Sequence, residues 1–346
     1  MPQLLLAGMS ALAILVSTGG SANSVPAVSQ AELTFTRASG GRDSVWVAEA
    51  DGSHARRIVT RAWTGGLSAD GRWLAFWRAH RAPNADLFVV NLAGRKPEWI
   101  CRSCEARWAP VGHRVAIVDR SGLRLLDPSS GKRRLLVARR HLEEPSFSPR
   151  GRAVAYVKSN EGVGGAYRSD IFAVRISDRA VTRFTRDGHS DSPVWGPHWI
   201  VYRRHHWAGG LSPQGRLWLM RPDGTGKRAF ARGAEGLYGG GYPVFGLEPL
   251  ALSADGRRLL ACQAFEFGCS RVAFTVPGGK RYGFPQLRPV ERDSGATPTD
   301  LSADGRRVLL DVGSPHGGRH ALYEIPFVGG KLRLLARNAS DGSWRR

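Results

Sequence analysis

The sequence lacks long hydrophobic runs and several familiar catalytic motifs. None of its apolar stretches approaches the roughly 18 residues that span a bilayer, which argues against a transmembrane protein. It contains no G-x-S-x-G nucleophile elbow, and its glycine-rich tracts are not followed by the Lys-Ser/Thr pair of a Walker A loop. Serine-hydrolase chemistry of the elbow type and P-loop nucleotide hydrolysis are therefore excluded.

Lysine is scarce in a chain that is otherwise strongly basic. The 346 residues include 50 basic and 29 acidic ones, which gives a net charge of +21, and only six of the basic residues are Lys. The other 44 are Arg, a bias that a GC-rich genome would produce by itself. Whatever its origin, the charge attracts the protein to polyanions.

Cysteine is also infrequent, and its four copies form two close pairs. Cys101 and Cys104 are separated by two residues, whereas Cys262 and Cys269 flank a short predicted hairpin, where a bridge across the strands is geometrically reasonable. An even number of cysteines in an exported chain predicts disulfide bonds. The C-x-x-C spacing of the first pair also occurs in redox and zinc sites, but no second such motif accompanies it.

Residues 1–24 have the pattern of a cleavable signal peptide. Leu4–Val16 forms the apolar core, and small residues up to Ser24 follow it as a cleavage site. No Lys or Arg precedes the core, and a wrongly assigned start codon is the alternative interpretation. We predict export of residues 25–346 to the periplasm, the cell wall or the medium. The expected partner there is an envelope protein or an acidic glycan or wall polymer, and no nucleic acid is expected.

Glycine and proline are abundant, with 43 and 20 residues, which favours many short strands joined by tight turns. A ten-residue pattern, seen first in Leu67–Phe76, recurs along the chain. Each copy predicts a short strand, a turn whose glycine permits positive φ, and a second apolar strand. The turn glycines occupy positions 71, 112, 151, 196, 256 and 305, and another strand pair follows each turn. Four strands in roughly 40–45 residues are typical of a β-propeller blade.

The two ends of the chain predict how the ring closes. The strand that begins at Leu33 opens a blade that has its b, c and d strands but not its innermost a strand. The last copy of the turn motif, Ala339–Trp344, would supply that missing strand and remove an open sheet edge. We therefore predict an all-β protein, a single propeller domain of seven four-stranded blades, with six or eight as the alternatives. Its first blade is closed by the C-terminal strand.

The S-x-D-G-R/K turn with its apolar strand, as in Leu252–Ala261 and Leu301–Leu310, resembles the WD40-like PD40 repeat of the TolB-type β-propellers. The resemblance extends over residues 32–346 and implies the propeller fold. It implies little about function, because propellers host many unrelated activities. TolB also has an α/β domain before its propeller, for which this chain has no room, so the partners of TolB are not transferred to it.

The predicted propeller has one face of short, uniform turns and one face of longer, irregular loops. Aspartates of the short turns, such as Asp70, are interpreted as turn formers, which leaves the loop face as the better candidate for binding. Arginine binds carboxylates in bidentate fashion, and Trp and Tyr stack on sugar rings. The candidate ligand-binding residues on the loop face are Arg78, Arg81, Arg203, Arg204, Trp207, Tyr238, Tyr242 and Arg319. A solvated basic surface without a ligand is the alternative.

Three histidines on the loop face carry a second hypothesis. Propellers of the oligogalacturonate-lyase type are similar in fold and use clustered histidines with a metal in a central pocket, which would here be His205, His316 and His320. Against this, His205 and His206 are adjacent and would point to opposite sides of a strand. The prediction is an exported, monomeric binding or scaffold protein without cofactor or enzymatic activity. The alternative is a metal-dependent polysaccharide lyase.

Overall fold

The computed structural model describes residues 31–39, 42–79, 85–94, 96–161, 167–207, 213–231, 237–238, 242–265, 268–283, 295–313 and 320–345. The predicted signal peptide (1–24), Arg81, His316 and Arg319 lie outside these residues, and so do the side chains of Trp207, Tyr238, Tyr242 and Cys269. No helix within the described ranges is long and apolar enough to cross a membrane.

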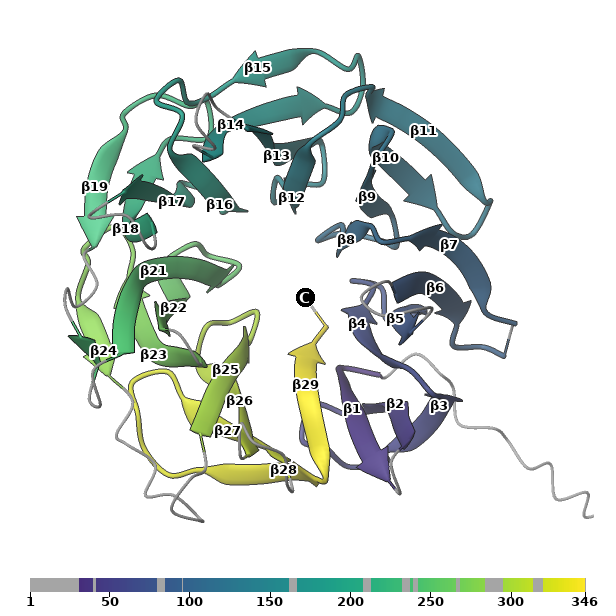
Figure 1. Ribbon diagram of the computed structural model, residues 1–346. Coiled ribbons are helices and arrows are strands. Elements are labelled where there is room, and N and C mark those ends of the chain that lie inside the picture. The colour runs from purple at the N-terminus through teal and green to yellow at the C-terminus, as the bar shows by residue number, and fades with distance from the viewer. Residues whose placement is uncertain are drawn as a thin grey trace, which may run out of the picture.

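The described strands form a closed ring of seven four-stranded blades around a central axis (Figure 1). Blades 1 to 4, each given from the axis outwards, contain the following strands: β29 (Ala339–Trp344), β1 (Leu33–Ser39), β2 (Arg42–Ala48) and β3 (Arg56–Thr60); β4 (Trp63–Leu67), β5 (Trp73–Ala79), β6 (Ala85–Asn91) and β7 (Glu98–Arg102); β8 (Glu105–Trp108), β9 (Val115–Asp119), β10 (Gly122–Asp127) and β11 (Lys132–Val137); β12 (Leu142–Phe147), β13 (Ala153–Glu161), β14 (Tyr167–Arg175) and β15 (Val181–Arg183).

Blades 5 to 7 complete the ring: β16 (Ser190–Trp195), β17 (Ile200–Trp207), β18 (Pro213–Met220) and β19 (Arg228–Ala231); β21 (Tyr242–Leu252), β22 (Arg258–Phe265), β23 (Gly268–Thr275) and β24 (Arg281–Gly283); β25 (Gly295–Leu301), β26 (Arg307–Gly313), β27 (Ala321–Pro326) and β28 (Arg333–Arg337). Five blades are separate sheets, and blades 5 and 6 share a nine-stranded sheet that includes the short β20 (Leu237–Tyr238). The predicted seven-bladed propeller is the fold of the chain.

The ring closes in blade 1 through the last strand of the chain, as predicted. The antiparallel pair of β29 and β1 brings Leu33 opposite Trp344 and Arg37 opposite Ala339. Asp300 of blade 7 accepts a hydrogen bond from the backbone N–H of Trp344 at 3.0 Å, which ties the closing strand to the preceding blade. The inner edge of β1 is therefore paired with another strand rather than exposed.

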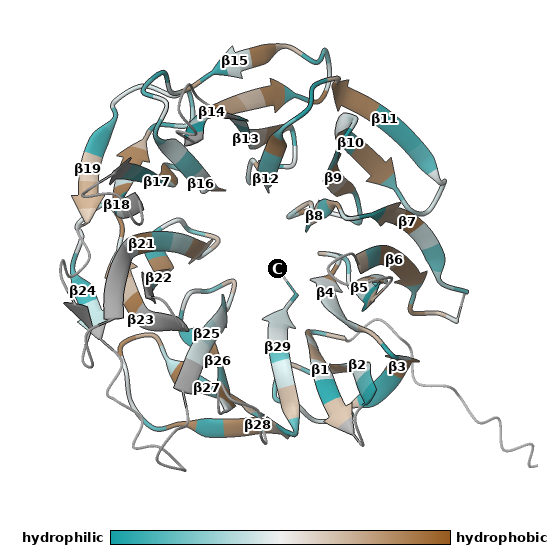
Figure 2. Cartoon of the chain, viewed as in Figure 1, coloured by the Kyte–Doolittle hydropathy of each residue, from teal (hydrophilic) through white to brown (hydrophobic). Residues whose placement is uncertain are grey.

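The hydrophobic core lies in the seams between neighbouring blades. Leu33 and Phe35 of blade 1, for example, pack with Leu309 and Leu322 of blade 7. Hydrophobic residues are concentrated on middle strands such as β10, whereas the innermost strand β29 is mostly pale or hydrophilic (Figure 2). Each blade thus buries one face against the blade before it and the other against the blade after it.

The repeated turn between the a and b strands is built by its serine and aspartate. In blade 2 the Ser68 hydroxyl donates to Asp70 at 2.6 Å, and Asp70 accepts from the backbone N–H of Arg72 at 3.1 Å. The same serine–aspartate hydrogen bond recurs in blades 6 and 7, from Ser253 to Asp255 and from Ser302 to Asp304. These contacts give the turn aspartates the structural role expected from the sequence.

Blades 5 and 6 are linked more directly than the others. A parallel bridge joins β18 to β21 at Gly215 and Gly246, and β20 forms a hairpin with the start of β21. Gly246 has a φ of 90°, and a Cβ added there would lie 2.2 Å from the backbone nitrogen of Gly215. The long step between the fifth and sixth repeats therefore contains an extra strand and a close backbone contact. Tyr242, predicted in a connecting loop, is instead the first residue of β21.

One disulfide joins Cys101 and Cys104, at the passage from the outer strand of blade 2 to the inner strand of blade 3. Cys262 of β22 is also disulfide-bonded. Its predicted partner, Cys269, lies on the paired strand β23, opposite Ala264. Because the side chain of Cys269 is outside the described residues, the pairing of Cys262 with Cys269 stays a prediction.

Candidate functional site

Two of the predicted arginines, Arg203 and Arg204 of β17, are engaged by carboxylates of the protein itself. Nε and Nη2 of Arg203 donate to the two carboxylate oxygens of Asp191 at 2.6 and 3.0 Å, and Nη1 lies 3.5 Å from Glu248 of blade 6. Nε of Arg204 lies 3.0 Å from Asp187. Arg203 therefore connects blades 5 and 6, and a ligand at either arginine would have to compete with an internal carboxylate.

Arg78, predicted from the sequence, belongs to a set of cations that the sequence reasoning missed. In four b strands a buried aromatic residue is followed two positions later by a cation, and these pairs are Phe35 and Arg37, Phe76 and Arg78, Tyr156 and Lys158, and Tyr202 and Arg204. Residues two apart in a strand point to the same side. Each cation therefore lies over the blade seam that its aromatic neighbour fills, at the loop end of the strand.

The guanidinium groups of this set stack on aromatic rings of the paired c strand. Arg37 lies 4.3 Å from the ring centroid of Trp46, Arg78 lies 5.2 Å from that of Phe88, and Arg204 lies 4.7 Å from that of Trp218. Such cation–π contacts hold the side chains in place without neutralising their charge.

Arg37 and Arg78 also carry a buried Nε that has no hydrogen-bond partner among the described atoms. Burial lowers the pKa of Arg37, although a guanidinium stays charged in any case. We refer to Arg37, Arg78, Lys158 and Arg204 as the seam cations. The aromatic-x-cation spacing in the repeated b strand is the signal that could have identified Arg37 and Lys158 from the sequence.

A chain of carboxylates links the inner strands of blades 3, 4 and 5. Glu105 accepts a hydrogen bond from the backbone N–H of Glu144 at 2.6 Å, and Glu144 accepts from the backbone N–H and the hydroxyl of Ser192 at 2.5 and 3.2 Å. Burial, followed by repulsion from Asp191, raises the pKa of Glu144 to about 7, and burial also raises the pKa of Glu105. These groups hold neighbouring blades together near the loop end of the channel.

The two described histidines of the lyase hypothesis have separate carboxylate partners. His205 of blade 5 is 3% exposed, and its Nδ1 lies 3.2 Å from Asp191. Nδ1 of His320, which precedes β27 of blade 7, lies 2.8 Å from Asp311. Although burial opposes it, hydrogen bonds from His205 and Arg203 lower the pKa of Asp191. Within the described parts of the chain, no group of three or more His, Cys, Asp or Glu side chains is arranged to hold a metal ion.

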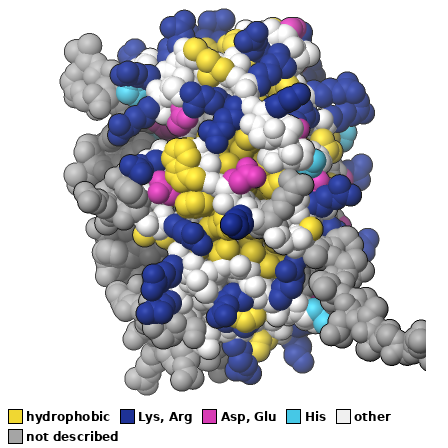
Figure 3. Space-filling model, turned by 90° about the vertical axis from the view of Figure 1, so that its right-hand side faces the viewer, with side chains coloured by type: hydrophobic (Ala, Val, Ile, Leu, Met, Phe, Trp, Pro, Cys, Tyr) yellow, Lys and Arg dark blue, Asp and Glu magenta, His cyan; other side chains and the backbone are white. Residues whose placement is uncertain are grey.

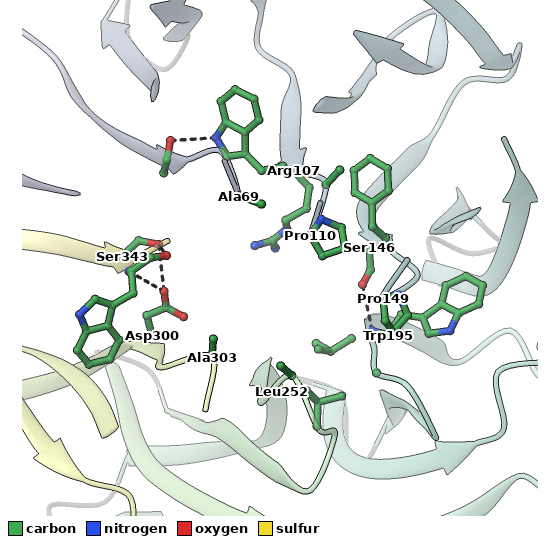
Figure 4. A pocket seen from close by; sticks show the side chains of 18 of the residues that line it. Ala69, Arg107, Pro110, Ser146, Pro149, Trp195, Leu252, Asp300, Ala303 and Ser343 are labelled. Atoms are coloured by element: carbon green, nitrogen blue, oxygen red, sulfur yellow. Dashed lines mark hydrogen bonds between the residues drawn. The ribbon is translucent and has the colours of Figure 1, made fainter. Parts of the chain in front are cut away.

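A cavity of about 390 Å³ lies at the opposite end of the channel, where the a strands meet the short turns. Its walls come from the ends of the seven inner strands and from the turns that follow them, and they include small residues and prolines such as Pro110 and Pro149. Figure 4 shows Arg107 of β8 and Asp300 of β25 directed into this cavity from different sides, with Ser146 and Ser343 also on its wall. The sequence reasoning placed no site at this end, because the lining is divided among all seven blades, with two to five residues from each.

The charged surface is not confined to either end of the channel. On the side of the molecule that carries the outer strands of the first blades, Lys and Arg side chains are spread over the whole face with few acidic side chains among them (Figure 3). Outer strands such as β11, which contains Lys132, Arg133 and Arg134, contribute to this distribution. Basic residues on exposed sheet edges discourage pairing with other chains.

No protein-family model matches the sequence, and no curated protein matches it either. Solved structures do. The crystal structure of TolB from Acinetobacter baumannii is 16% identical with a TM-score of 0.50, over 93% of this chain and 68% of that one. An oligogalacturonate lyase in complex with manganese is 12% identical with a TM-score of 0.60, over 89% of this chain and 86% of that one.

A third match is the β-propeller domain of the Trilobed protease from Pyrococcus furiosus, 12% identical with a TM-score of 0.59, over 89% of this chain and 95% of that one. The chain shares the β-propeller fold of these structures. That fold is shared by proteins as different as TolB, lyases and peptidases, so it does not define an activity. The Pyrococcus propeller has an open velcro topology, whereas the propeller of this chain is closed by the pair of β29 and β1.

Proposed function

We propose that this chain is a non-enzymatic binding module of the bacterial cell envelope that binds an acidic polymer at the loop end of its propeller. The observation that carries the proposal is the set of seam cations, Arg37, Arg78, Lys158 and Arg204. The three arginines of the set are stacked on aromatic rings, so they lose little conformational entropy on binding. Arg204 is also paired with Asp187, so Arg37 and Arg78 carry most of the proposal.

The spacing of the seam cations suits a polymer better than a compact ligand. They lie on blades 1, 2, 4 and 5, each at the loop end of a different seam, so a ligand that contacts several of them must extend around the ring. Blade 3 has Asp119 at the equivalent position, two residues after Ile117. A polyuronate or a wall polymer carries negative charges at repeated intervals and meets this requirement. The export of residues 25–346, predicted from the sequence, would bring the protein to such polymers.

The first experiment is a titration of the chain with polygalacturonate at low and moderate salt. Replacing Arg37 and Arg78 by Gln should weaken binding by about tenfold or more, because two charge-assisted contacts are lost. The matched control replaces Arg72 and Arg152, two exposed arginines at the turn end, by Gln and removes the same charge. If both double variants bound polygalacturonate equally weakly, net charge alone would explain the effect, and the proposal would be overturned.

The same titration tests the lyase hypothesis. Polygalacturonate is incubated with and without a divalent metal while the absorbance of unsaturated products is followed. We expect no metal-dependent product. If product formed, the protein would be an enzyme, and the histidines of the loop end would be the first residues to substitute.

A further inference from the structure

The cavity at the turn end of the channel is independent of the seam cations and has the properties of a small-molecule site. Its volume of about 390 Å³ lies near the lower end of the range of about 300–1,000 Å³ that is usual for such sites. The walls combine prolines, small residues and larger apolar side chains such as Phe147 and Trp195 with a few polar side chains, as binding pockets commonly do.

Two opposite charges enter this cavity from blades that lie across the ring. Arg107 comes from blade 3 and Asp300 from blade 7, and both occupy the position before the last residue of their inner strand. Figure 4 shows the guanidinium of Arg107 and the carboxylate of Asp300 directed toward the middle of the cavity. The cavity therefore has a positive side and a negative side.

Asp300 is held rigidly in this orientation. It is 3% exposed, its Oδ1 accepts from the backbone N–H of Leu301 at 2.8 Å, and its Oδ2 accepts from the hydroxyl of Ser343 and the backbone N–H of Trp344, both at 3.0 Å. A carboxylate fixed by three donors presents its charge at a defined point on the cavity wall, which is the pre-organisation that small-ligand binding requires.

We propose that this cavity binds a small zwitterion of about dipeptide size. Its carboxylate lies at Arg107, its ammonium group lies at Asp300, and its apolar part lies against the proline-containing wall. Arginine suits the carboxylate because the planar guanidinium donates two parallel hydrogen bonds.

The probe is glycyl-tryptophan, titrated by calorimetry into the full chain. Two neutralised relatives serve as comparisons: the N-acetyl dipeptide, which has no ammonium group, and the dipeptide amide, which has no carboxylate. Arg107→Ala should weaken binding of glycyl-tryptophan at least about tenfold and abolish its advantage over the amide. Asp300→Asn keeps the oxygen that accepts from the backbone N–H of Trp344. This variant should bind glycyl-tryptophan no more tightly than the N-acetyl dipeptide.

The control is Arg152→Ala, which removes the same charge from a turn at this end of the molecule but not from the cavity. It should bind glycyl-tryptophan like the unaltered chain. The proposal is wrong if no saturable binding of glycyl-tryptophan is seen, if Arg107→Ala binds as well as the unaltered chain, or if Arg152→Ala weakens binding equally. Polygalacturonate binding by the Arg107→Ala variant should be retained, which separates this site from the proposed polymer site.

Discussion

At the scale of single residues, the most unusual group is Glu144. Its carboxylate bridges blades 4 and 5 through Ser192, and it is surrounded by Asp191, Glu248 and the guanidinium of Arg203. Burial and the neighbouring carboxylates outweigh the hydrogen bond from Ser192 and the charge of Arg203, so its pKa is raised to about 7. The protonated form is therefore favoured in the folded protein.

This raised pKa predicts a dependence of stability on pH. Between the ordinary glutamate pKa of about 4.5 and the folded value of about 7, the folded protein binds more protons than the unfolded chain, so the free energy of unfolding falls as pH rises through this window. The loss amounts to at most about 3–4 kcal/mol, since one pKa unit corresponds to about 1.4 kcal/mol. Glu144→Gln should remove the part of the slope due to this group. Glu105 and Asp311, whose pKa values burial also raises, should leave a smaller slope.

Urea unfolding at pH 5 and pH 8 measures the effect. Glu98→Gln, on the exposed part of β7, is the control and should leave the slope unchanged. Identical slopes for Glu144→Gln and the unaltered chain would show that Glu144 does not ionise in this window.

At the scale of the elements, the bridge between β18 and β21 depends on two glycines. Gly246→Ala should lower the free energy of unfolding by about 3 kcal/mol or more, because it combines an unfavourable positive φ with a Cβ 2.2 Å from the backbone of Gly215. Gly131→Ala is the matched control, since Gly131 has a φ of 67° but no atom within 4 Å of an added Cβ. It should cost only about 1 kcal/mol. Chemical denaturation distinguishes the two, and equal losses would mean that the bridge adds nothing.

The elements also show which parts of the structure the sequence could predict. The Ser-x-Asp-Gly turn is made by contacts between residues a few positions apart, such as Ser68 and Asp70, so its repeats located the blades. The bond between Asp191 and Arg203 depends on strand register. The cavity depends on residues such as Arg107 and Asp300, which line the same space only because the blades form a ring. Spacing along the chain contains no signal for contacts of that kind.

The seam cations were only partly predictable from the sequence. Their aromatic-x-cation pattern is local and was present in the sequence, in Phe35 to Arg37 for example. The structure shows what the pattern does: strand register places Trp46 opposite Phe35, and the guanidinium of Arg37 stacks over the Trp46 ring. A search for positions that repeat from blade to blade, rather than for unusual loops, would have found them.

At the scale of the whole molecule, stability depends on closure of the ring. Trp344 is 5% exposed and packs with Leu33, Phe35 and Leu309 across the junction of blades 7 and 1. Trp344→Ala should lower the melting temperature by about 10 °C, because loss of a buried aromatic side chain costs about 3–5 kcal/mol.

Calorimetry measures the melting temperature, and size-exclusion chromatography shows whether the loosened edge of β1 promotes association. Exposed Trp99 of β7 provides the control, since Trp99→Ala should change the melting temperature little. A melting temperature unaffected by Trp344→Ala would mean that the pair of β1 and β29 does not hold the ring together.

The closing pair also affects how the chain can acquire its structure. Leu33 pairs with Trp344, so blade 1 cannot be completed until nearly the entire polypeptide has left the ribosome. Such a contact between distant sequence positions raises the contact order and slows folding. Until it forms, β1 has an unpaired inner edge that other chains can reach. A propeller closed in this way remains an incomplete ring throughout its synthesis.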